Sequence, residues 1–295
     1  MKEKVVYHYD AFTTQPGKGN PAGIVLNEGN LSTEEMQQIA KAVGFNECAF
    51  PMKSDIADIR IRYFTPGYET PLCGHATMAS MAMLLDQGIL PLKESYLIET
   101  LAGVLPVNVT KEGGQTKIRM QHAEPQFVAF EGSKADLARS LNIPVSMIDT
   151  RYPIMYGNTG QWTLCLPILD INVFKQMKPE TACFPEILKE MPESSVHPFC
   201  FNALSKDADL HARHFSSPYA GTIEDPVTGT ASGVMGAYIA KYVKQKCKEK
   251  YDLVVEQGQE IGKDGRVIVH VDAEEEISIA ISGTAVFVQK IIITM

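Results

Sequence analysis

Nine residues, E-T-P-L-C-G-H-A-T (Glu69–Thr77), lead directly into a run of small and apolar residues, M-A-S-M-A-M-L-L (Met78–Leu85). A second stretch, E-D-P-V-T-G-T-A-S (Glu224–Ser232), leads into G-V-M-G-A-Y-I-A (Gly233–Ala240) in the same way. At an offset of 155 residues the two stretches share glutamate, proline, glycine and alanine, and they keep the similar pairs Leu/Val and Thr/Ser. Each stretch is typical of a helix mouth, and the Gly and Ala residues that follow would let strands pack closely against the helix on all sides.

The residues upstream of these stretches repeat as well. S-D-I-A-D-I-R-I-R-Y-F-T-P-G-Y (Ser54–Tyr68) aligns with S-K-D-A-D-L-H-A-R-H-F-S-S-P-Y (Ser205–Tyr219) at an offset of 151, and Ser, Ala, Asp, Arg, Phe and Tyr coincide in register. The offset then grows by four because residues 220–223 (A-G-T-I) are an insertion in the second copy. The period is far too long for a solenoid. Two adjoining blocks on nearly one offset predict a duplication, with two similar domains related by a pseudo-two-fold axis.

Strands are expected around the two helices. Ile59–Phe64 and Leu210–Phe215 precede the mouths, and the start of the chain goes straight into a strand. Later strands are expected at 95–100 and 104–109, and again at 252–257 and 266–271, with glycines at the turns. Since strands dominate and each half keeps one central helix, we predict a mixed α/β (α+β) fold.

The bulk properties limit the class of protein. A chain of 295 residues exceeds the size at which a single core usually stops growing, so two domains are expected. We place them at residues 1–116, joined by the C-terminal strand 284–295, and at residues 117–283. The net charge of −8, without a concentration of Lys and Arg, argues against nucleic-acid binding.

The same properties indicate a cytoplasmic protein. No apolar run approaches the length of a membrane span, and the first residues lack the apolar segment of a signal peptide. The six cysteines are scattered without a C-x-x-C pair, which is typical of reduced thiols. We expect five of them to be small core residues and single out only Cys73.

Both mouths suit an anion. Residues 73–75 and 228–230 offer backbone N–H donors at the positive end of a helix dipole, where a carboxylate or phosphate binds readily. Pro71 and Pro226 are expected in the first helical turn, where a missing N–H costs nothing. Two well-capped helices would explain the same residues without a ligand. We favour a shared cleft for a small anionic substrate, since two mouths on a pseudo-two-fold axis can face one cleft.

The two mouths differ at the positions that could handle protons. Asp225 stands where the first copy has Thr70, and His75 stands where the second copy has Thr230. Both are therefore candidate proton-handling groups.

Glu47 is the remaining candidate, in the apolar run V-G-F-N-E-C-A-F (Val43–Phe50). The helix before it is expected to begin at Ser32, with Glu35 completing a capping box, and to stop at Gly44. Glu47 then opens the next strand. A carboxylate in so apolar a run is expected to have a raised pKa, which suits a general acid/base near neutral pH. The alternative is an edge-strand glutamate that points at water.

Other polar patterns carry less information. G-K-G-N-P (Gly17–Pro21) lacks P-loop spacing, and a loop beside a ligand, with Asn20 as a substrate contact, explains it as well as a plain turn does. The two histidines of H-A-R-H (211–214) should face opposite sides of a strand. Cys73 and His75 have no evident further ligand to complete a zinc shell. We therefore predict no metal site.

With these motifs in hand, the chain resembles the phenazine-biosynthesis PhzF-like family, within the diaminopimelate epimerase and proline racemase superfamily. The matching stretches are Asp10–Leu26, Asn46–Phe50, Tyr63–Thr77 and Glu224–Gly233. They occur in the order found in the family and cover both halves of the chain. The resemblance implies two domains, each a barrel-like, mostly antiparallel sheet around a central helix, with the active site between them. It also implies an isomerase without a cofactor that forms a homodimer and acts on a small carboxylate.

The resemblance also implies roles for individual residues. Glu47 corresponds to the acid/base carboxylate of the family, and His75 and Asp225 to its substrate-contacting or proton-relaying partners. The expected substrate-binding residues are Asn20, Cys73, Gly74, Gly229 and Thr230, with Gly74 and Thr230 at the backbone donors for a substrate carboxylate.

Two alternatives remain open. Racemases of the superfamily use one cysteine at each mouth, whereas here only Cys73 is present and Thr228 occupies the second position. Cys73 is then a wall residue or, in the first alternative, the single thiol of an amino-acid racemase or epimerase. The second alternative is a catalytically silent protein that binds small anions.

Overall fold

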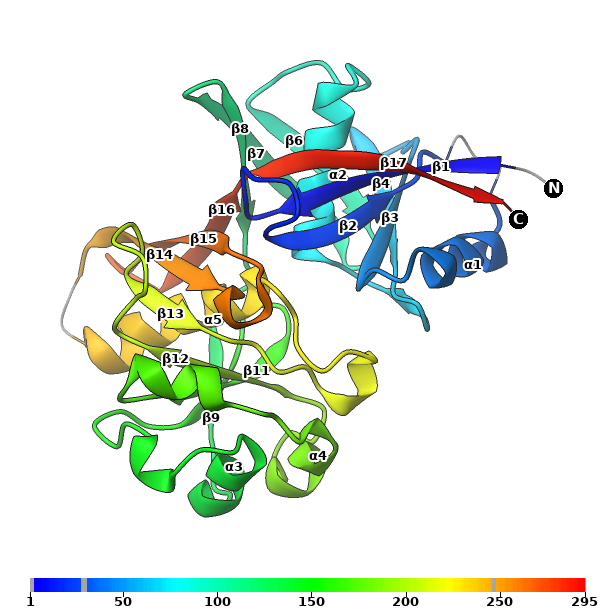
Figure 1. Cartoon of the computed structure of the whole chain (residues 1–295). Coiled ribbons are helices and arrows are strands. Elements are labelled where there is room, and N and C mark those ends of the chain that lie inside the picture. Colours follow the sequence, from blue (N-terminus) through cyan, green and yellow to red (C-terminus); the bar gives the residue numbers. More distant parts are fainter. Residues whose placement is uncertain (1–2, 28–30, 246–247, 295) are drawn as a thin grey trace. The chain divides into compact units, whose positions relative to one another are not determined.

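The chain forms two compact units in the computed structural model, which describes residues 3–27, 31–245 and 248–294 (Figure 1). Unit 1 comprises Met1–Gln121 and Ser282–Met295, and unit 2 comprises His122–Ile281. The C-terminal segment thus returns to the N-terminal unit. The assignment of these units to two duplicated domains stays a prediction.

Unit 1 is built from nine strands and two helices among its described residues. The strands are β1 (Glu3–Ala11), β2 (Asn20–Ile24), β3 (Glu47–Met52), β4 (Ile59–Phe64), β5 (Glu69–Thr70), β6 (Ser95–Thr100), β7 (Gly103–Glu112), β8 (Gln115–Gln121) and β17 (Ala285–Thr294). The helices are α1 (Thr33–Val43) and α2 (Gly74–Asp86). The pairings are antiparallel except β2 with β3 and β4 with β6.

Unit 2 repeats this plan with more short helices. Its strands are β9 (Gln126–Ala129), β10 (Met155–Asn158), β11 (Trp162–Pro167), β12 (Ser195–Cys200), β13 (Leu210–Ala212), β14 (Lys250–Gln257), β15 (Gly265–Asp272) and most of β16 (Ser278–Gly283). Its α-helices are α3 (Lys134–Ser140), α4 (Phe184–Ile187) and α5 (Gly229–Tyr238), and α5 continues as a π-helix, η5 (Ile239–Val243). Short 3₁₀-helices are η1 (Val145–Met147), η2 (Ile171–Gln176), η3 (Thr181–Cys183), η4 (Pro218–Ala220) and η6 (Gln259–Ile261).

The order of strand pairings is the same in the two units. It runs antiparallel, parallel, antiparallel, parallel, antiparallel through β1, β2, β3, β4, β6 and β7 in unit 1. The same sequence of pairings runs through β10, β11, β12, β13, β14 and β15 in unit 2. The repeat found in the chain therefore extends to the topology, and the predicted fold class is confirmed.

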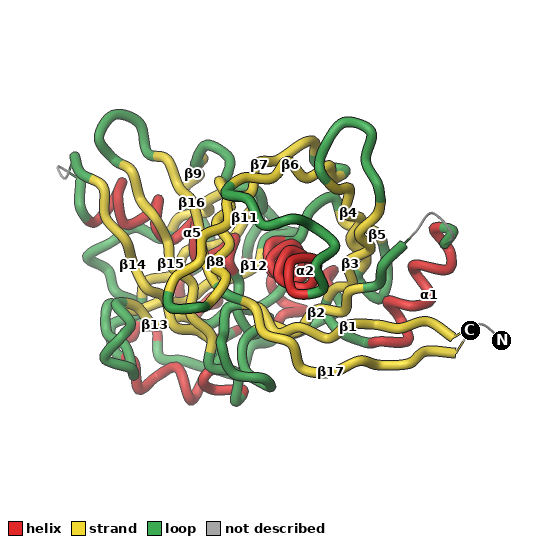
Figure 2. Tube along the Cα trace, turned by 90° about the horizontal axis from the view of Figure 1, so that it is seen from above, coloured by secondary structure: helices red, strands yellow, loops and turns green. Residues whose placement is uncertain are grey.

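Helix α2 lies at the centre of unit 1. Figure 2 views it nearly end-on, and β1, β2, β3, β8 and β17 contact it. Ten of its thirteen residues are buried, in keeping with an apolar surface on every side. Its alanines and serine keep the helix thin enough for strands to approach from several directions.

Helix α5 has the same place in unit 2, and its glycines are needed for packing. Nine of its ten residues are buried. A Cβ on Gly233 would lie 2.3 Å from the Nδ1 atom of His122, and one on Gly236 would lie 2.5 Å from a methyl carbon of Val269. Only glycine fits at these two positions without movement of the neighbours.

Two local expectations need correction. The prolines of the mouths do not lie in the first helical turn: the N-cap residues are Cys73 and Thr228, so Pro71 and Pro226 precede both helices. The strand expected at Leu210–Phe215 stops at Ala212, although Phe215 still forms isolated bridges. Phe215 pairs with Val196 and with Glu224 in these bridges.

The cysteine prediction was right for some residues and wrong for others. Cys48, Cys165 and Cys200 are buried, and burial raises the pKa of the Cys48 thiol to about 12, with a smaller contribution from the charge of Glu47. Cys183 is exposed, because it ends the η3 turn at the surface. Cys247 lies outside the described residues.

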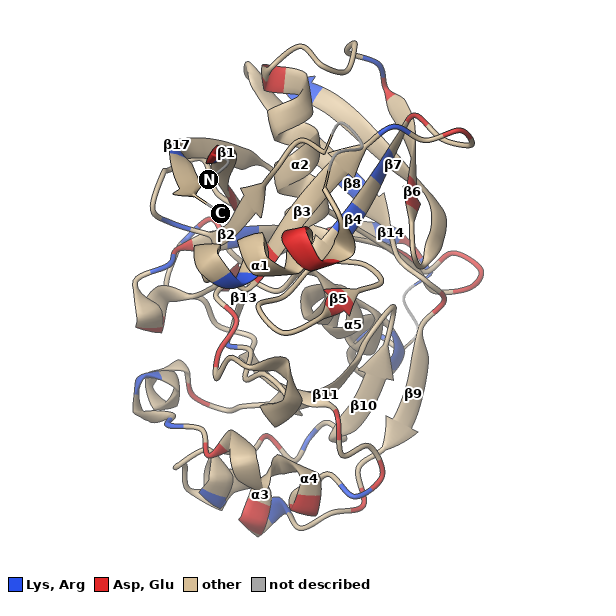
Figure 3. Cartoon of the chain, turned by 90° about the vertical axis from the view of Figure 1, so that its right-hand side faces the viewer, with Lys and Arg blue, Asp and Glu red and all other residues tan. Residues whose placement is uncertain are grey.

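The distribution of charged residues and the apolar character of the helices agree with the expectations from the sequence. Figure 3 shows Lys and Arg scattered over many elements, with acidic residues interspersed. Among the helices of the described residues, none has both the length and the apolar character needed to cross a membrane.

Candidate active site

The chain brings Glu47 into position through helix α1. Ser32 caps the helix as predicted: its hydroxyl accepts from the Glu35 N–H at 3.2 Å, and the Glu35 carboxylate accepts from the Ser32 N–H at 2.8 Å. Gly44 ends the helix at φ +72°, a left-handed conformation that favours glycine. Glu47 then opens β3, as predicted.

Glu47 is not an edge-strand residue. β3 lies between β2 and β4, and the Glu47 side chain is only 21% exposed. Its carboxylate lies 3.2 Å from the Nε2 atom of His75, the second residue of α2. The expectation of a carboxylate pointing at water was therefore the wrong alternative.

Cys73 completes a cluster of three polar side chains at the mouth of α2. Its Sγ atom lies 3.4 Å from Nδ1 and 3.9 Å from Nε2 of His75. Cys73 and His75 are buried, and one donor atom from each of the three residues lies within 4.8 Å of the others. The imidazole thus links the thiol and the carboxylate.

This cluster changes the expectation about metals. The sequence showed no third ligand beside Cys73 and His75, but the fold supplies Glu47. A thiolate, an imidazole and a carboxylate are a donor set that zinc accepts. The three side chains could therefore hold a metal ion as well as move a proton.

The mouth of α2 leaves space at Gly74, its first residue. Cys73, the N-cap residue, has an extended backbone, and among the described residues its side chain makes no capping hydrogen bond to the helix. A Cβ on Gly74 would have no described atom within 4 Å. Behind the mouth, the Thr77 hydroxyl donates to the Cys73 carbonyl at 2.7 Å and lies 2.6 Å from the Tyr63 hydroxyl.

The mouth of α5 is built in the same way but carries Asp225. Thr228 is its N-cap residue, again extended and, within the described part of the chain, without a side-chain cap to the helix. The Ser232 hydroxyl donates to the Thr228 carbonyl at 2.8 Å, just as Thr77 does in unit 1. The Thr228 hydroxyl donates to Asp225 at 2.5 Å. Gly229 is buried and Thr230 is half-buried at the start of the helix.

Gln257 fixes this second mouth, and the sequence did not single it out. Its amide oxygen accepts from the Thr228 N–H at 3.1 Å. Its amide nitrogen donates to the Asp225 carbonyl at 2.8 Å and to the Thr228 hydroxyl at 3.1 Å. Its position at the end of β14, just before Gly258, was the one available signal, but a glutamine at a strand end is common.

Asn20 is fully buried at the start of β2, opposite Ala11 of β1. The glycines before it serve the turn: Gly19 has φ +66°, and a Cβ there would lie 2.2 Å from the Ala11 carbonyl oxygen. The Asp10 carboxylate accepts from the Gly17 N–H at 2.6 Å. The turn interpretation thus accounts for the glycines, and the contact of Asn20 with a substrate stays a prediction.

Two further histidines of unit 2 are buried side by side. The Nδ1 atoms of His197 and His214 are 3.3 Å apart, and the His214 carbonyl accepts from the Asp225 N–H at 3.0 Å. Burial lowers the pKa of His214 to about 4, although the charge of Asp225 acts in the opposite direction. Burial and the neighbouring His214 also lower the pKa of His197. Both rings are therefore neutral near pH 7.

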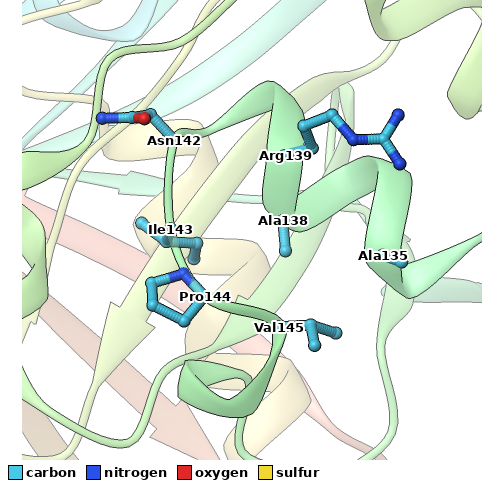
Figure 4. A pocket seen from close by; sticks show the side chains of 7 residues that line it. All are labelled: Ala135, Ala138, Arg139, Asn142, Ile143, Pro144 and Val145. Atoms are coloured by element: carbon cyan, nitrogen blue, oxygen red, sulfur yellow. The ribbon is translucent and has the colours of Figure 1, made fainter.

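A pocket elsewhere in unit 2 contains none of these groups. It is formed by helix α3 and the segment after it, and Figure 4 shows its lining: Ala135, Ala138, Arg139, Asn142, Ile143, Pro144 and Val145. The Arg139 guanidinium, which points away from Pro144 in Figure 4, pairs with Asp136 at 2.7 Å and is largely exposed. We assign no function to this pocket.

Comparisons with known proteins agree over nearly the whole chain. A family described as "Phenazine biosynthesis-like protein" matches residues 9–290. "Uncharacterized isomerase YfhB" of Bacillus subtilis (strain 168) is 48% identical over 288 residues, which is 97% of each chain. The crystal structure of a PhzF-family phenazine biosynthesis protein from Bacillus anthracis superposes over 100% of each chain with a TM-score of 0.97 and 51% identity.

A more distant likeness concerns the fold alone. A probable proline racemase from Agrobacterium radiobacter K84, solved with bound carbonate, has a TM-score of 0.63 at 12% identity. It covers 99% of this chain and 93% of its own. The two units thus have the fold shared with racemases of this kind.

Proposed function

Because this chain belongs to the phenazine biosynthesis-like protein family, we propose that it is an isomerase that moves a proton on a small carboxylate substrate without a cofactor. The observation that carries the proposal is the pairing of Glu47 with His75 at the mouth of α2. A reaction that takes a proton from one atom and returns it to another needs one group that both accepts and donates. A partly buried carboxylate held by an imidazole is such a group.

In the proposed cycle, the ionised Glu47 takes a proton from a substrate carbon and then, as the acid, gives it back at a second position. His75 donates its Nε2–H to one carboxylate oxygen and leaves the other oxygen for the substrate. The Cys73 thiol can donate to Nδ1, which keeps the ring in this tautomer. Cys73 is then a wall and positioning residue.

The helix mouths supply the binding groups of the proposal. In each unit the backbone N–H groups at the helix mouth, Gly74 in unit 1 and Gly229 and Thr230 in unit 2, are suited to an anion, because they lie at the positive end of a buried helix. Asp225 is proposed as a second proton-handling group, and Asn20 as a polar contact. The expected homodimer also stays a prediction, which ultracentrifugation of the full chain would test.

The decisive experiment is an NMR screen of small carboxylic acids in deuterated buffer. Enzyme-dependent exchange of a C–H proton, lost in Glu47→Gln but kept in the control Glu131→Gln at an exposed position, supports the proposal. Exchange that persists at the parent rate in Glu47→Gln contradicts it.

One observation favours a second candidate, a racemase or epimerase with a single thiol. Cys73 lies within hydrogen-bond distance of an imidazole that could take its proton. Loss of exchange in Cys73→Ser, with Glu47→Gln active, would select this reaction. Binding of a carboxylate without any proton exchange would instead indicate a silent anion-binding protein.

A further inference from the structure

In each unit, an arginine forms two hydrogen bonds with the carboxylate of the glutamate that precedes the helix mouth. In unit 1, Arg62 of β4 donates from Nε and Nη2 to the two carboxylate oxygens of Glu69, each at 2.6 Å. In unit 2, Arg213 donates from the same two nitrogens to the two oxygens of Glu224, at 2.8 and 2.6 Å. These are two-point, charge-assisted hydrogen bonds, which fix orientation as well as distance.

The surroundings of the two arginines also repeat. The guanidinium of Arg62 lies over the ring of Phe64, 5.2 Å from its centre, and that of Arg213 lies over Phe215 at 4.8 Å. Phe64 pairs with Glu69 in the β4–β5 ladder, and Phe215 forms an antiparallel bridge with Glu224. We call each set of arginine, phenylalanine and glutamate a clamp.

The clamp has the same form although the loop inside it changed length. Arg62 and Glu69 are seven residues apart, whereas Arg213 and Glu224 are eleven apart. The four inserted residues, 220–223, therefore lengthen the loop without changing the hydrogen bonds between the glutamate and its arginine. A contact that followed from the loop alone would have changed with the loop, so the position of the glutamate is the feature that both copies keep.

The residue after each glutamate is placed by this geometry. Thr70 pairs with Tyr63 in β4–β5, and Asp225 donates its N–H to the carbonyl of His214, the residue after Arg213. Asp225 in turn accepts from the hydroxyl of Thr228, the N-cap residue of α5. The second clamp thus connects β13 and its continuation to the carboxylate at the mouth.

The second clamp is the more deeply buried of the two. Arg213 and Glu224 have side chains only 6% and 11% exposed, against 18% and 19% for Arg62 and Glu69. Arg213 also donates from Nη1 to the carbonyls of Phe174 and Met177, at 2.7 and 3.1 Å. Screening by solvent is weaker at such a buried pair, and its extra bonds tie it to the core of unit 2.

We propose that Arg213, through Glu224, is a positioning residue for Asp225. In unit 1, Arg62 acts in the same way through Glu69 on the segment that leads to the mouth of α2. The inference rests on the proposed role of Asp225 in proton transfer. A misplacement of a reacting group by about 1 Å can cost roughly 10²-fold in rate, so contacts that fix the position of Asp225 should affect turnover strongly.

A double-mutant cycle tests the proposal. Arg213→Lys keeps the charge and removes the fork, so we expect turnover to fall about 10- to 100-fold with KM nearly unchanged. If Arg213 acts through Asp225, the same change made in Asp225→Asn should cost almost nothing further. Equal loss in both backgrounds, or a fall in melting temperature that alone explains the lost activity, would overturn the proposal.

A second measurement does not depend on isomerase activity. In amide NMR spectra, Arg213→Lys should shift the signals of Thr228 and Gly229, whereas the matched variant Arg62→Lys should shift those of Gly74 and His75. Shifts that stay near the substituted arginine and do not reach the mouths would contradict the proposal even if no substrate is known. If Arg213→Lys does not fold, Glu224→Asp, which shortens the same bridge, is the variant to measure.

Discussion

The candidate chemistry depends on one contact between residues that are far apart in the chain. The Glu47 carboxylate meets the His75 imidazole at 3.2 Å, and the Cys73 thiol meets the other nitrogen of that ring at 3.4 Å. One imidazole therefore connects a carboxylate to a thiol in a largely buried place. The two candidate reactions can therefore be distinguished: the acid/base isomerase needs Glu47, and the single-thiol racemase or epimerase needs Cys73.

The first prediction at this scale concerns Glu47→Gln. The amide keeps the shape of the side chain and cannot accept a proton, so turnover should fall by about 10²–10⁴-fold while the substrate still binds. Steady-state kinetics together with a binding titration would check both parts. Unchanged turnover would make Cys73 the residue to test next.

The second prediction concerns metal ions. Activity should survive chelation, because a Glu47–His75 pair can transfer protons by itself. Added Zn²⁺ should inhibit reversibly, since it would use the thiol, the imidazole and the carboxylate that lie within 4.8 Å of one another. Inhibition should weaken in Cys73→Ser and remain in Cys183→Ser, which removes an exposed thiol. Activity that requires added metal would exclude the cofactor-free reaction.

At the scale of elements, the two central helices are packed tightly, and the first residue of α2, Gly74, has open space around it. Glycine serves opposite purposes within them. Gly236 of α5 is in close contact with Val269, whereas Gly74 at the start of α2 has open space where a side chain would be. Gly233 and Gly236 thus allow neighbouring side chains to pack against α5, and Gly74 leaves the backbone at the start of α2 accessible.

A pair of alanine substitutions should separate these purposes. Gly236→Ala gains helix propensity, but its methyl group would lie 2.5 Å from Val269, so we expect a net loss of roughly 1–2 kcal/mol in the free energy of unfolding. Gly74→Ala should leave stability unchanged or slightly higher and should weaken binding of a carboxylate substrate. Denaturant unfolding and a substrate titration on both variants would check this. Equal stability of the two variants would contradict the packing argument.

At the scale of the whole molecule, a buried charge network links stability to pH. His211 lies between two carboxylates, at 2.8 Å from Glu256 and 3.0 Å from Glu260, and all three side chains are buried. Burial alone would lower the pKa of His211, but the hydrogen bonds and charges of the two glutamates raise it. For Glu256 and Glu260, burial acts upward, and the bonds to His211 hold their pKa values below the usual range.

The sign of the pH effect follows from these directions. The raised pKa of His211 stabilises the fold fully below about pH 6.5, its usual value, and this stability is lost as the pH rises through the higher folded value. The lowered pKa values of the glutamates stabilise the fold above the usual carboxylate range, and this is lost on acidification. The free energy of unfolding should therefore pass through a maximum at mildly acidic to neutral pH.

The variant His211→Gln tests this prediction. It should lower stability most at the pH of that maximum and flatten the decline on the alkaline side. Urea unfolding across pH, with His270→Gln as a control at the more exposed pair with Asp252, would measure it. A parallel downward shift at every pH would mean that His211 stays neutral in the folded protein.

Local patterns in the chain were enough to predict much of this protein. Capping at Ser32, the stop at Gly44, the opening of a strand at Glu47 and the two central helices all depend on residues a few positions apart. The repeat predicted the fold class because aligned residues occupy equivalent places in two similar units. Such features are encoded by near neighbours along the chain, so they can be inferred without coordinates.

Contacts between distant segments were decided only by the folded structure. Three such contacts join different elements. Glu47 lies beside His75 and Cys73, Gln257 donates a hydrogen bond to the carbonyl of Asp225, and Arg213 donates hydrogen bonds to Glu224. The shared Arg and Glu were visible as coincidences in the repeat, but their pairing was not. A side chain's partner depends on how strands and helices pack, and packing is a property of the whole core rather than of any short stretch of sequence.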